Sequence, residues 1–348
     1  MSVTSTAGKL RLIQAGVGGH GRGWFFNTSS QSPDFDVVAL ADPNAEVLAK
    51  AADAIDLPPD RRFAELADAV AAVDADAVLS VTPPAVHPQH SELAFANGLH
   101  LLVEKPLAEN LDAARRMVEQ ADAAGKRLMV GQNRRWDAEP AFLKQIFDEK
   151  PYGDFGHAHV DFFLPGDFRG SFRESMRHVL LVDMTVHHID LARFILGRDV
   201  KRVYATDFNP AWSAAGGYYQ NGAALRMILT MEDDTVVSYS GDWSAKGRPN
   251  SWQGAWRLQC AKGAISFDDR LGGVELATCK AWGGDVEREV RPIPPRDPSQ
   301  GQLLAAFAES IRTGQPGLTS GRDNLKTVAA VFAAVESCET GRAVEVRA

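Results

Sequence analysis

Cysteine is scarce in this sequence. The three cysteines, Cys260, Cys279 and Cys338, lie far apart, and no two of them form a Cys-x-x-Cys pair. Structural zinc sites and disulfide frameworks both need cysteines at characteristic spacings, so neither is predicted and no metal site is expected. So few cysteines also fit a protein of the reducing cytoplasm, which is the predicted location.

The sequence also lacks long apolar runs and an excess of positive charge. No apolar stretch approaches the ~20 residues that cross a membrane, and residues 1–9 have none of the regions of a secretory signal. The 37 Lys and Arg against 45 Asp and Glu give a formal charge of -8. This is the wrong sign for a protein that binds nucleic acid by neutralising its phosphates. Neither a membrane nor a nucleic acid is therefore expected as a partner.

The chain has the composition of an ordinary globular protein. Apolar residues make up 45% of it and charged residues 24%, which is enough apolar material for a large core. With roughly 150 residues per domain, the 348 residues predict about two domains.

The first part of the chain alternates short apolar runs with segments rich in Ala and Glu. This alternation is typical of a parallel sheet whose two faces are covered by helices. It predicts a doubly wound domain over residues 1–132. The expected strands are Leu10 to Ala15, Val37 to Ala41, Ala77 to Val81, Leu99 to Val103 and Leu128 to Val130, and the expected helices include Glu46 to Ala54, Ser91 to Ala96 and Leu111 to Ala124.

The rhythm changes after Arg135 and predicts a second α/β domain over residues 133–348. Turn-forming groups at 232–234 and 262–263 separate several of its strands, so an open, largely antiparallel sheet is expected. Its C-terminal helices could pack back on the first domain. The expected strands are 155–163, 200–208, 223–231, 235–239, 255–259, 264–268 and 274–278, and the expected helices are 141–148, 183–196, 302–312 and 324–337.

A glycine-rich turn follows the first expected strand. Residues Gly16 to Gly21 read Gly-Val-Gly-Gly-His-Gly, and Asp42 stands 21 residues further on, at the end of the second strand. Such a turn allows a pyrophosphate to approach a helix N-terminus, and the carboxylate can bind the adenosine ribose hydroxyls. The pattern favours NAD over NADP, although Arg22 could tolerate a 2′-phosphate. The alternative is a glycine-rich turn with no nucleotide.

Ligands of open parallel sheets bind beyond the carboxyl ends of the strands. Two strand ends are unusual, because Thr82-Pro83-Pro84 with His87 follows one of them and Glu104-Lys105-Pro106 follows the other. The proline keeps Lys105 in an extended backbone, so its ammonium group can point toward a ligand. A Lys-Pro turn that faces solvent is the alternative.

A histidine and two carboxylates are grouped in the second half. At 3.6 residues per turn Asp183, His187 and Asp190 share one helical face, while His188 is turned about 100° away. A carboxylate one turn before a histidine can orient it as a general base. Two alternatives stay open, namely a structural hydrogen-bonded pair and part of a metal site for which no third ligand is apparent.

In this order the features resemble the Gfo/Idh/MocA family of oxidoreductases over nearly the whole chain. The resemblance rests on the glycine loop, Thr82 to His87, Glu104 to Pro106, Arg135 and the segment Asp183 to Asp190, together with the C-terminal Ser320 to Asp323 and Gly341 to Val344. It implies a Rossmann domain followed by an α/β domain, NAD as the cofactor, and a homodimer or homotetramer. Lys105, Asp183 and His187 fall on the family's catalytic positions.

The resemblance implies an NAD-dependent dehydrogenase of carbohydrate metabolism that oxidises a sugar or polyol hydroxyl, with oxidation of an aldose to a lactone favoured. An NAD-dependent glycosidase that passes through an oxidised intermediate, or a regulator that binds dinucleotides without catalysis, are the alternatives. The residues expected to contact cofactor are Gly16, Gly18, Gly19, His20, Gly21, Arg22, Asp42, Thr82, Pro83, His87, Glu104 and Lys105. Those expected to contact substrate are Lys105, Arg135, Trp136, Arg169, His178, Asp183, His187 and Trp243.

Overall fold

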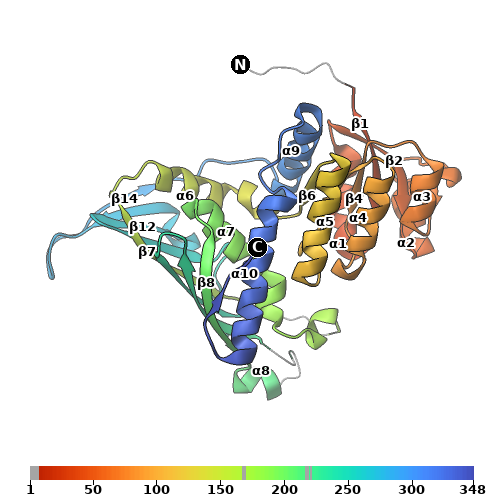
Figure 1. The fold of residues 1–348 in the computed structure, drawn as a ribbon. Coiled ribbons are helices and arrows are strands. Elements are labelled where there is room, and N and C mark those ends of the chain that lie inside the picture. The colour runs from red at the N-terminus through yellow and green to blue at the C-terminus, as the bar shows by residue number, and fades with distance from the viewer. Residues whose placement is uncertain (1–7, 167–169, 216–218, 220–221) are drawn as a thin grey trace. The chain divides into compact units, whose positions relative to one another are not determined.

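The computed structural model describes residues 8–166, 170–215, 219 and 222–348 (Figure 1). The chain divides into two compact units. The first unit comprises Met1–Asn133 and Asp297–Leu325, and the second comprises Arg134–Arg296 and Lys326–Ala348. Asp297–Leu325 therefore groups with the first unit, whereas the expected division placed it in the second domain. Over the described residues, no helix is both long enough and apolar enough to span a membrane.

The first unit contains a six-stranded sheet with the order β3-β2-β1-β4-β5-β6, and each neighbouring pair of strands is parallel. The central strands are buried on both faces, because helices cover both sides of the sheet. The strands are β1 Leu10–Ala15, β2 Phe35–Ala41, β3 Arg62–Phe63, β4 Ala77–Ser80, β5 His100–Val103 and β6 Leu128–Val130.

Local signals place the ends of the helices in this unit. The Asn44 side chain accepts hydrogen bonds from the backbone N–H groups of Glu46 and Val47 and begins α2, and Asn110 begins α5 in the same way. Gly125, in the left-handed conformation, ends α5. The helices are α1 Gly19–Asn27, α2 Ala45–Asp53, α3 Leu66–Ala72, α4 His87–Ala96, α5 Leu111–Ala124 and α9 Ser299–Thr313.

The second unit contains a nine-stranded sheet with the order β14-β13-β12-β11-β7-β10-β9-β8-β15. Its pairs are antiparallel except for β7 with β10, which are parallel. The strands are β7 Phe155–Phe163, β8 Val200–Phe208, β9 Ala224–Met231, β10 Val236–Asp242, β11 Ala255–Cys260, β12 Gly263–Asp268, β13 Gly273–Thr278, β14 Glu287–Arg291 and β15 Val344–Glu345.

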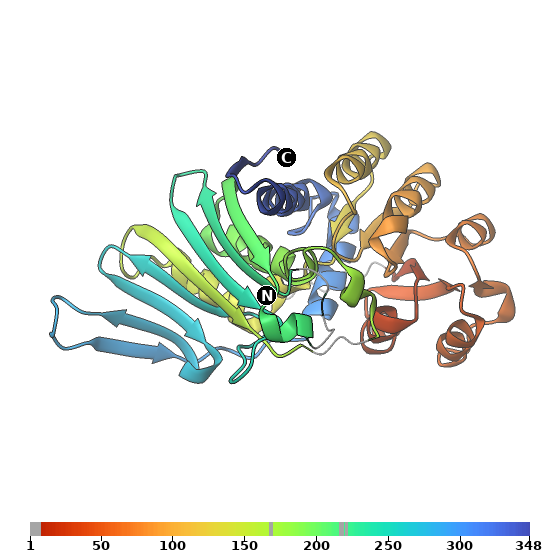
Figure 2. The same ribbon diagram turned by 90° about the horizontal axis from the view of Figure 1, so that it is seen from below.

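Helices lie along one face of this sheet, as Figure 2 shows for α10. Helix α7 is the most enclosed of them, with ten of its eleven residues buried. It continues from a π-helical segment, η6, so that the chain changes its helical pitch at Thr185. The helices of this unit are α6 Ala138–Asp148, η6 Leu180–Thr185, α7 Val186–Leu196, α8 Ala211–Ala215 and α10 Gly321–Thr340, of which α10 begins in the first unit.

The expected fold class is confirmed, with a parallel Rossmann-like sheet and a second, largely antiparallel sheet. Three short or charged strands, β3, β14 and β15, were not expected. The segment 183–196 was expected to be one α-helix, but its first three residues belong to the π-helical segment. Consequently the 3.6-residue spacing that grouped Asp183 with His187 and Asp190 does not hold across this boundary.

A buried ion-pair network anchors α7 to its neighbours. Arg135 donates to both carboxylate oxygens of Asp190 at 2.7 Å, and Thr327 on α10 donates to the same carboxylate at 2.9 Å. Arg193 donates to the Thr327 hydroxyl at 2.7 Å and to Asp199 at 2.7 Å. Asp190 and Arg135 are at most 5% exposed, so each charge depends on its partner for the solvation that water would otherwise supply.

Replacement of Asp190 by alanine should leave the Arg135 guanidinium buried without its carboxylate. We expect the free energy of unfolding of Asp190→Ala to fall by about 3–5 kcal/mol, measured by urea denaturation with tryptophan fluorescence. The matched control is Asp148→Ala, which breaks the exposed Lys144–Asp148 pair of α6 and should leave the free energy of unfolding unchanged within error. Equal effects of the two variants would refute the anchoring role.

Candidate active site

The glycine loop after β1 is so tightly packed that its outer glycines exclude a side chain. Gly16 has φ +84°, and a Cβ atom there would overlap the carbonyl oxygen of Val81. A Cβ atom at Gly21 would overlap the carbonyl oxygen of Gly16. Gln14, which is fully buried, donates to the carbonyl oxygens of both Gly16 and Gly21 and holds the loop closed. The loop therefore brings the start of α1 directly against the end of β1.

The start of α1 has the features of an anion site. Gly18 is its N-cap residue and provides no side-chain cap, and a Cβ atom at Gly19 would meet only open space. The first N–H groups of a helix and its dipole attract a phosphate, and the small loop residues let one approach. The loop thus fits the pyrophosphate of a dinucleotide, which is the role expected for Gly16 to Gly21.

Asp42 lies directly after β2 and is bonded to the glycine loop. Its Oδ2 accepts hydrogen bonds from the N–H groups of Val17 at 2.9 Å and Gly18 at 3.2 Å, and its Oδ1 accepts one from Asn44 at 2.9 Å. This fixes the carboxylate beside the loop, where a ribose of a bound dinucleotide is expected. Arg22 stacks over the ring of Phe26 on the exposed side of α1.

Glu104 joins the glycine-loop helix to the end of β5. Its Oε1 accepts a 2.6 Å hydrogen bond from Trp24 and lies 3.2 Å from His20 Nε2, while its Oε2 accepts one from the Lys105 N–H at 2.9 Å. Burial raises the pKa of Glu104, but the His20 hydrogen bond, the nearby positive charges and Trp24 outweigh it and leave the pKa below its usual value. Lys105, half-buried, is therefore held next to the first turn of α1 by an ionised carboxylate.

The loop after β4 is tied to the loop after β5. His87 is fully buried, with Nε2 3.0 Å from the Thr82 carbonyl oxygen and Nδ1 3.2 Å from the Leu107 carbonyl oxygen. His87 was expected to contact the cofactor, but the two loops bury its ring completely. Thr82 and Pro83 are accessible at this strand end, and Thr82 bonds Ser80 at 2.9 Å.

In the second unit, Asp183 lies among arginines. Arg173 Nε donates to its Oδ2 at 2.7 Å, and the charge of Asp183 also acts on Arg134. Arg134 donates to the backbone carbonyl oxygen of Trp252 and to the side-chain oxygen of Gln253, each at 3.0 Å. Burial lowers the pKa of Arg134. The Asp183 side chain is only 11% exposed, and the groups nearest to it carry positive charge.

The two adjacent histidines of α7 have different surroundings. His187 is 6% exposed, in the first turn of the α-helix. His188 Nδ1 lies 3.1 Å from the Tyr239 hydroxyl and its Nε2 3.3 Å from the Trp252 carbonyl oxygen, and burial lowers the pKa of His188 to about 3. His188 is therefore a neutral core residue, in agreement with the side of the helix predicted for it.

Several expected substrate contacts have other partners. Arg135 is occupied by Asp190, as described above, and Trp243 is 1% exposed and stacks on Tyr219 in the core. Both residues were expected to contact substrate, but both are buried inside the unit. The sequence pattern does not show which side chains of a strand end or a short turn point into the core. His178 bonds Asp207 at 2.7 Å, and Trp136 is half-buried. Arg169 lies outside the described residues.

Sequence reasoning missed Arg134, Arg173 and Gln14. Arg134 and Arg135 are neighbours in a 3-10 turn at 133–136, and nothing in their sequence indicates that Arg135 enters the ion-pair network while Arg134 faces Asp183 and Trp252. Gln14 carried a usable signal, because a polar residue inside a buried apolar strand needs a specific partner.

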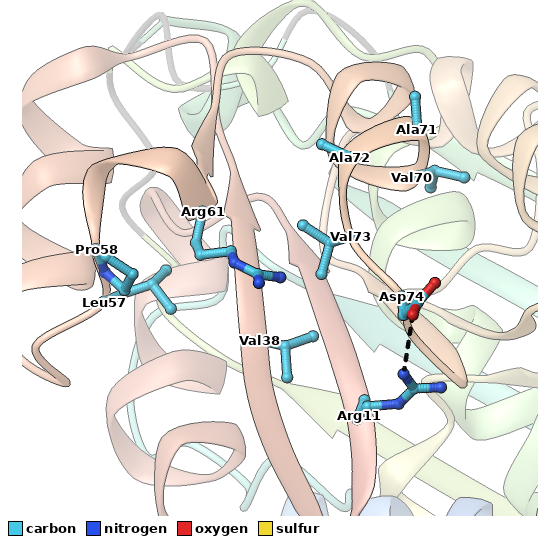
Figure 3. A pocket seen from close by; sticks show the side chains of 10 residues that line it. All are labelled: Arg11, Val38, Leu57, Pro58, Arg61, Val70, Ala71, Ala72, Val73 and Asp74. Carbon is cyan, nitrogen blue, oxygen red and sulfur yellow. Dashed lines mark ion pairs between the residues drawn. The ribbon is translucent and has the colours of Figure 1, made fainter.

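A groove of about 630 Å³ opens on the first unit, between the α2–β3 connection and α3 (Figure 3). It is lined by Val38, Leu57, Arg61 and Val73, with Arg11 and Asp74 paired at one end. Arg11 is the second residue of β1, so this groove lies at the opposite end of the strand from the glycine loop. It is separate from the candidate cofactor site.

Comparison with known proteins decides the family. A family model described as an oxidoreductase family with an NAD-binding Rossmann fold matches residues 11–132, and a model of the GFO/IDH/MocA C-terminal domain matches residues 141–266. The chain belongs to the Gfo/Idh/MocA family. It is accordingly an oxidoreductase with an NAD-binding Rossmann domain, in a family of sugar and polyol dehydrogenases.

Individual relatives agree over nearly their whole length. An inositol 2-dehydrogenase of Paenarthrobacter aurescens is 26% identical over 97% of this chain and 96% of its own. A D-apiose dehydrogenase of Paraburkholderia graminis is 29% identical over 90% of this chain and 83% of its own. An Agrobacterium radiobacter oxidoreductase, solved with NAD+, L-tartaric acid and magnesium, shares the fold with a TM-score of 0.85 at 22% identity, covering 97% and 98% of the two chains.

Loss of the Asp42 carboxylate should weaken NAD+ binding and reduce discrimination against NADP+. For Asp42→Ala we expect the Kd for NAD+ to rise about 10–100-fold, the equivalent of the ~1.5–3 kcal/mol that a hydrogen bond to a charged group contributes. Calorimetric titration with NAD+ and with NADP+ measures both effects without any substrate. Asp36→Ala, which removes an exposed carboxylate of β2, is the control. An unchanged Kd in Asp42→Ala would contradict the assignment.

Proposed function

We propose that the protein oxidises a hydroxyl group of a sugar or polyol and transfers the hydride to NAD+. The observation that carries the proposal is the hydrogen-bonded link from the glycine-loop helix through Glu104 to Lys105. It supports a lysine ammonium beside the dinucleotide site. NAD+, when bound, accepts the hydride.

Lys105 would act on the oxygen that reacts. Its ammonium group can donate a hydrogen bond to the substrate hydroxyl and stabilise the negative charge that develops on the oxygen as the proton leaves. The Glu104 carboxylate accepts the backbone N–H of Lys105, so the backbone at this position is fixed before substrate binds.

His187 would accept the hydroxyl proton, and Asp183 would orient it and bind a neighbouring hydroxyl. Arg173 donates a hydrogen bond to the Asp183 carboxylate at 2.7 Å, and the charge of Asp183 acts on Arg134. His187 lies in the first turn of α7, directly after the η6 segment that carries Asp183, and an imidazole is the side chain that serves most often as a general base.

The proposed cofactor is NAD in preference to NADP. A 2′-phosphate would bring negative charge toward the Asp42 carboxylate, which is fixed by Val17, Gly18 and Asn44. The N–H groups that hold Asp42 belong to the same loop that receives the pyrophosphate.

The proposed substrate is an aldose oxidised to a lactone, with an inositol oxidised to a ketone as the nearest alternative. Relatives named D-apiose dehydrogenase and inositol 2-dehydrogenase support both. Arg134 with Trp252, and the expected contacts Trp136 and Arg169, are the candidate residues for the sugar. An aromatic face and charged hydrogen-bond donors suit the apolar faces and the hydroxyls of a sugar ring.

We also propose a homodimer or homotetramer located in the cytoplasm. Tyr204, Phe208 and Ile228 are each close to half exposed on the adjacent strands β8 and β9. Their apolar surface, exposed on an open sheet, supports association with a second copy.

A panel of aldoses, inositols and aryl glycosides tests the function. Net formation of NADH, followed by absorbance, is expected with an aldose or inositol. Release of phenol without net NADH would instead identify an NAD-dependent glycosidase, and neither product would favour a regulator that binds dinucleotides without catalysis. The retained Lys105, Asp183 and His187 support the dehydrogenase.

Variants of Lys105 and His187 test the assignment of roles. We expect kcat on the substrate that the panel identifies to fall about 10²–10⁴-fold in Lys105→Met, which removes the group that stabilises the developing oxyanion, and in His187→Gln, which removes the proton acceptor. Lys50→Met on α2 and His157→Gln on β7 change exposed residues of the same types and should keep full kcat. If both active-site variants turned over at the wild-type rate, the roles would be wrong.

A further inference from the structure

Three side chains of metal-binding type meet in the second unit, apart from the residues assigned to catalysis. His178 precedes η6, Asp207 lies near the end of β8, and Cys338 lies in the last turns of α10. One potential ligand atom from each lies within 4.8 Å of the other two. They come from sequence positions far apart, so no spacing motif could have revealed them.

The three groups already interact directly. His178 Nδ1 is 2.7 Å from Asp207 Oδ2, and the Cys338 thiol lies within 4.8 Å of both groups. His178 and Asp207 are only 12% and 13% exposed. Burial and the Asp207 charge raise the pKa of the Cys338 thiol to about 12.

The backbone here is held in an uncommon conformation. His178 has φ +52°, in the left-handed region that side chains other than glycine seldom adopt. Gly222 packs so closely that a Cβ atom there would lie 2.9 Å from His178 Cα and would overlap Asp207 Oδ2. Conformations of this kind persist where the surrounding structure needs a side chain in one place.

The fourth neighbour, Glu339, faces the other nitrogen of the imidazole. His178 Nε2 is buried and has no hydrogen-bond partner among the residues that the structure describes. Glu339 Oε1 lies 3.6 Å from it and accepts a bond from Arg177. When Nδ1 binds a metal ion, the proton of a neutral imidazole must sit on Nε2. That N–H would then point at a carboxylate, the usual arrangement around histidine ligands of metals.

We propose that His178, Asp207 and Cys338 bind a zinc ion, with Glu339 holding the imidazole in the ligating tautomer. A thiolate and an imidazole select zinc over magnesium or calcium, which take oxygen ligands. Zinc bonds of about 2.0–2.3 Å put tetrahedral ligand atoms about 3.3–3.8 Å apart. The 2.7 Å separation of His178 Nδ1 and Asp207 Oδ2 must therefore open by about 0.6 Å, and separations that approach 4.8 Å must shorten by about 1 Å. Three protein ligands leave the fourth position to water.

Bound zinc would fasten the loop before η6 to β8 and to the end of α10. η6 carries Asp183, so the zinc would support the segment that leads to the proposed catalytic residues without touching the substrate. The proposal assigns His178 to the metal in place of the sugar contact expected for it. It does not depend on which substrate the protein oxidises.

Metal titration of the full-length protein without an affinity tag tests the site. After chelator treatment and re-addition of zinc, one zinc ion per chain should remain through gel filtration. Cobalt(II) should give the near-ultraviolet thiolate-to-metal absorption band. Cys338→Ser should abolish this band, whereas Cys279→Ser, which changes an exposed cysteine, should keep it.

Two further variants make the test specific. His178→Gln should lose zinc, and Glu339→Gln should weaken zinc binding about 10–100-fold, as loss of an outer-shell partner does. Zinc should raise the Tm of the wild type but not that of Cys338→Ser, and the two metal-free proteins should have the same Tm, which shows that the variant is folded. Absence of bound zinc, or equal zinc binding by wild type, Cys338→Ser and His178→Gln, would overturn the proposal.

Discussion

The buried carboxylate of Glu104 is the interaction on which the candidate cofactor site depends. A carboxylate enclosed in protein is costly unless it is hydrogen-bonded, and Glu104 meets this requirement by bonding Trp24, His20 and the Lys105 N–H. These partners lie on α1 and after β5, so ionisation of Glu104 and the alignment of the glycine loop with the lysine stabilise each other. Gly131, whose Cβ would lie 3.1 Å from this carboxyl group, leaves room for it.

The second unit also contains buried charged groups, and a different hydrogen-bonded network stabilises them. Arg135, Asp190, Thr327 and Arg193 bury their polar groups against one another and fix α7. Because His187 lies in the first turn of α7, and α7 continues from the π-helical segment that holds Asp183, this network fixes the backbone that carries both side chains. In each unit, buried charged groups and their hydrogen-bond partners thus fix the backbone near the proposed catalytic residues.

The sequence predicted most of the fold because apolar runs and turn residues determine it locally. Strands β1, β6, β7 and β8 begin and end where the apolar pattern does, and Gly16 and Gly21 are recognisable because only glycine fits there. The site was less predictable. Whether Arg134 or Arg135 faces Asp183, and whether Trp243 lines a pocket or fills the core, depends on contacts with distant strands and helices. Local sequence patterns also could not predict that His178 lies beside residues of β8 and α10.

Isotope transfer tests most directly that this chain oxidises a carbon-bound hydroxyl with NAD. The substrate would carry deuterium on the carbon of the reacting hydroxyl, and the nicotinamide product would be analysed by mass spectrometry. The account predicts one deuterium in each NADH and an oxidised, unlabelled carbon in the sugar or polyol product. Unlabelled NADH, or a product that retains its deuterium without net NADH, would contradict it.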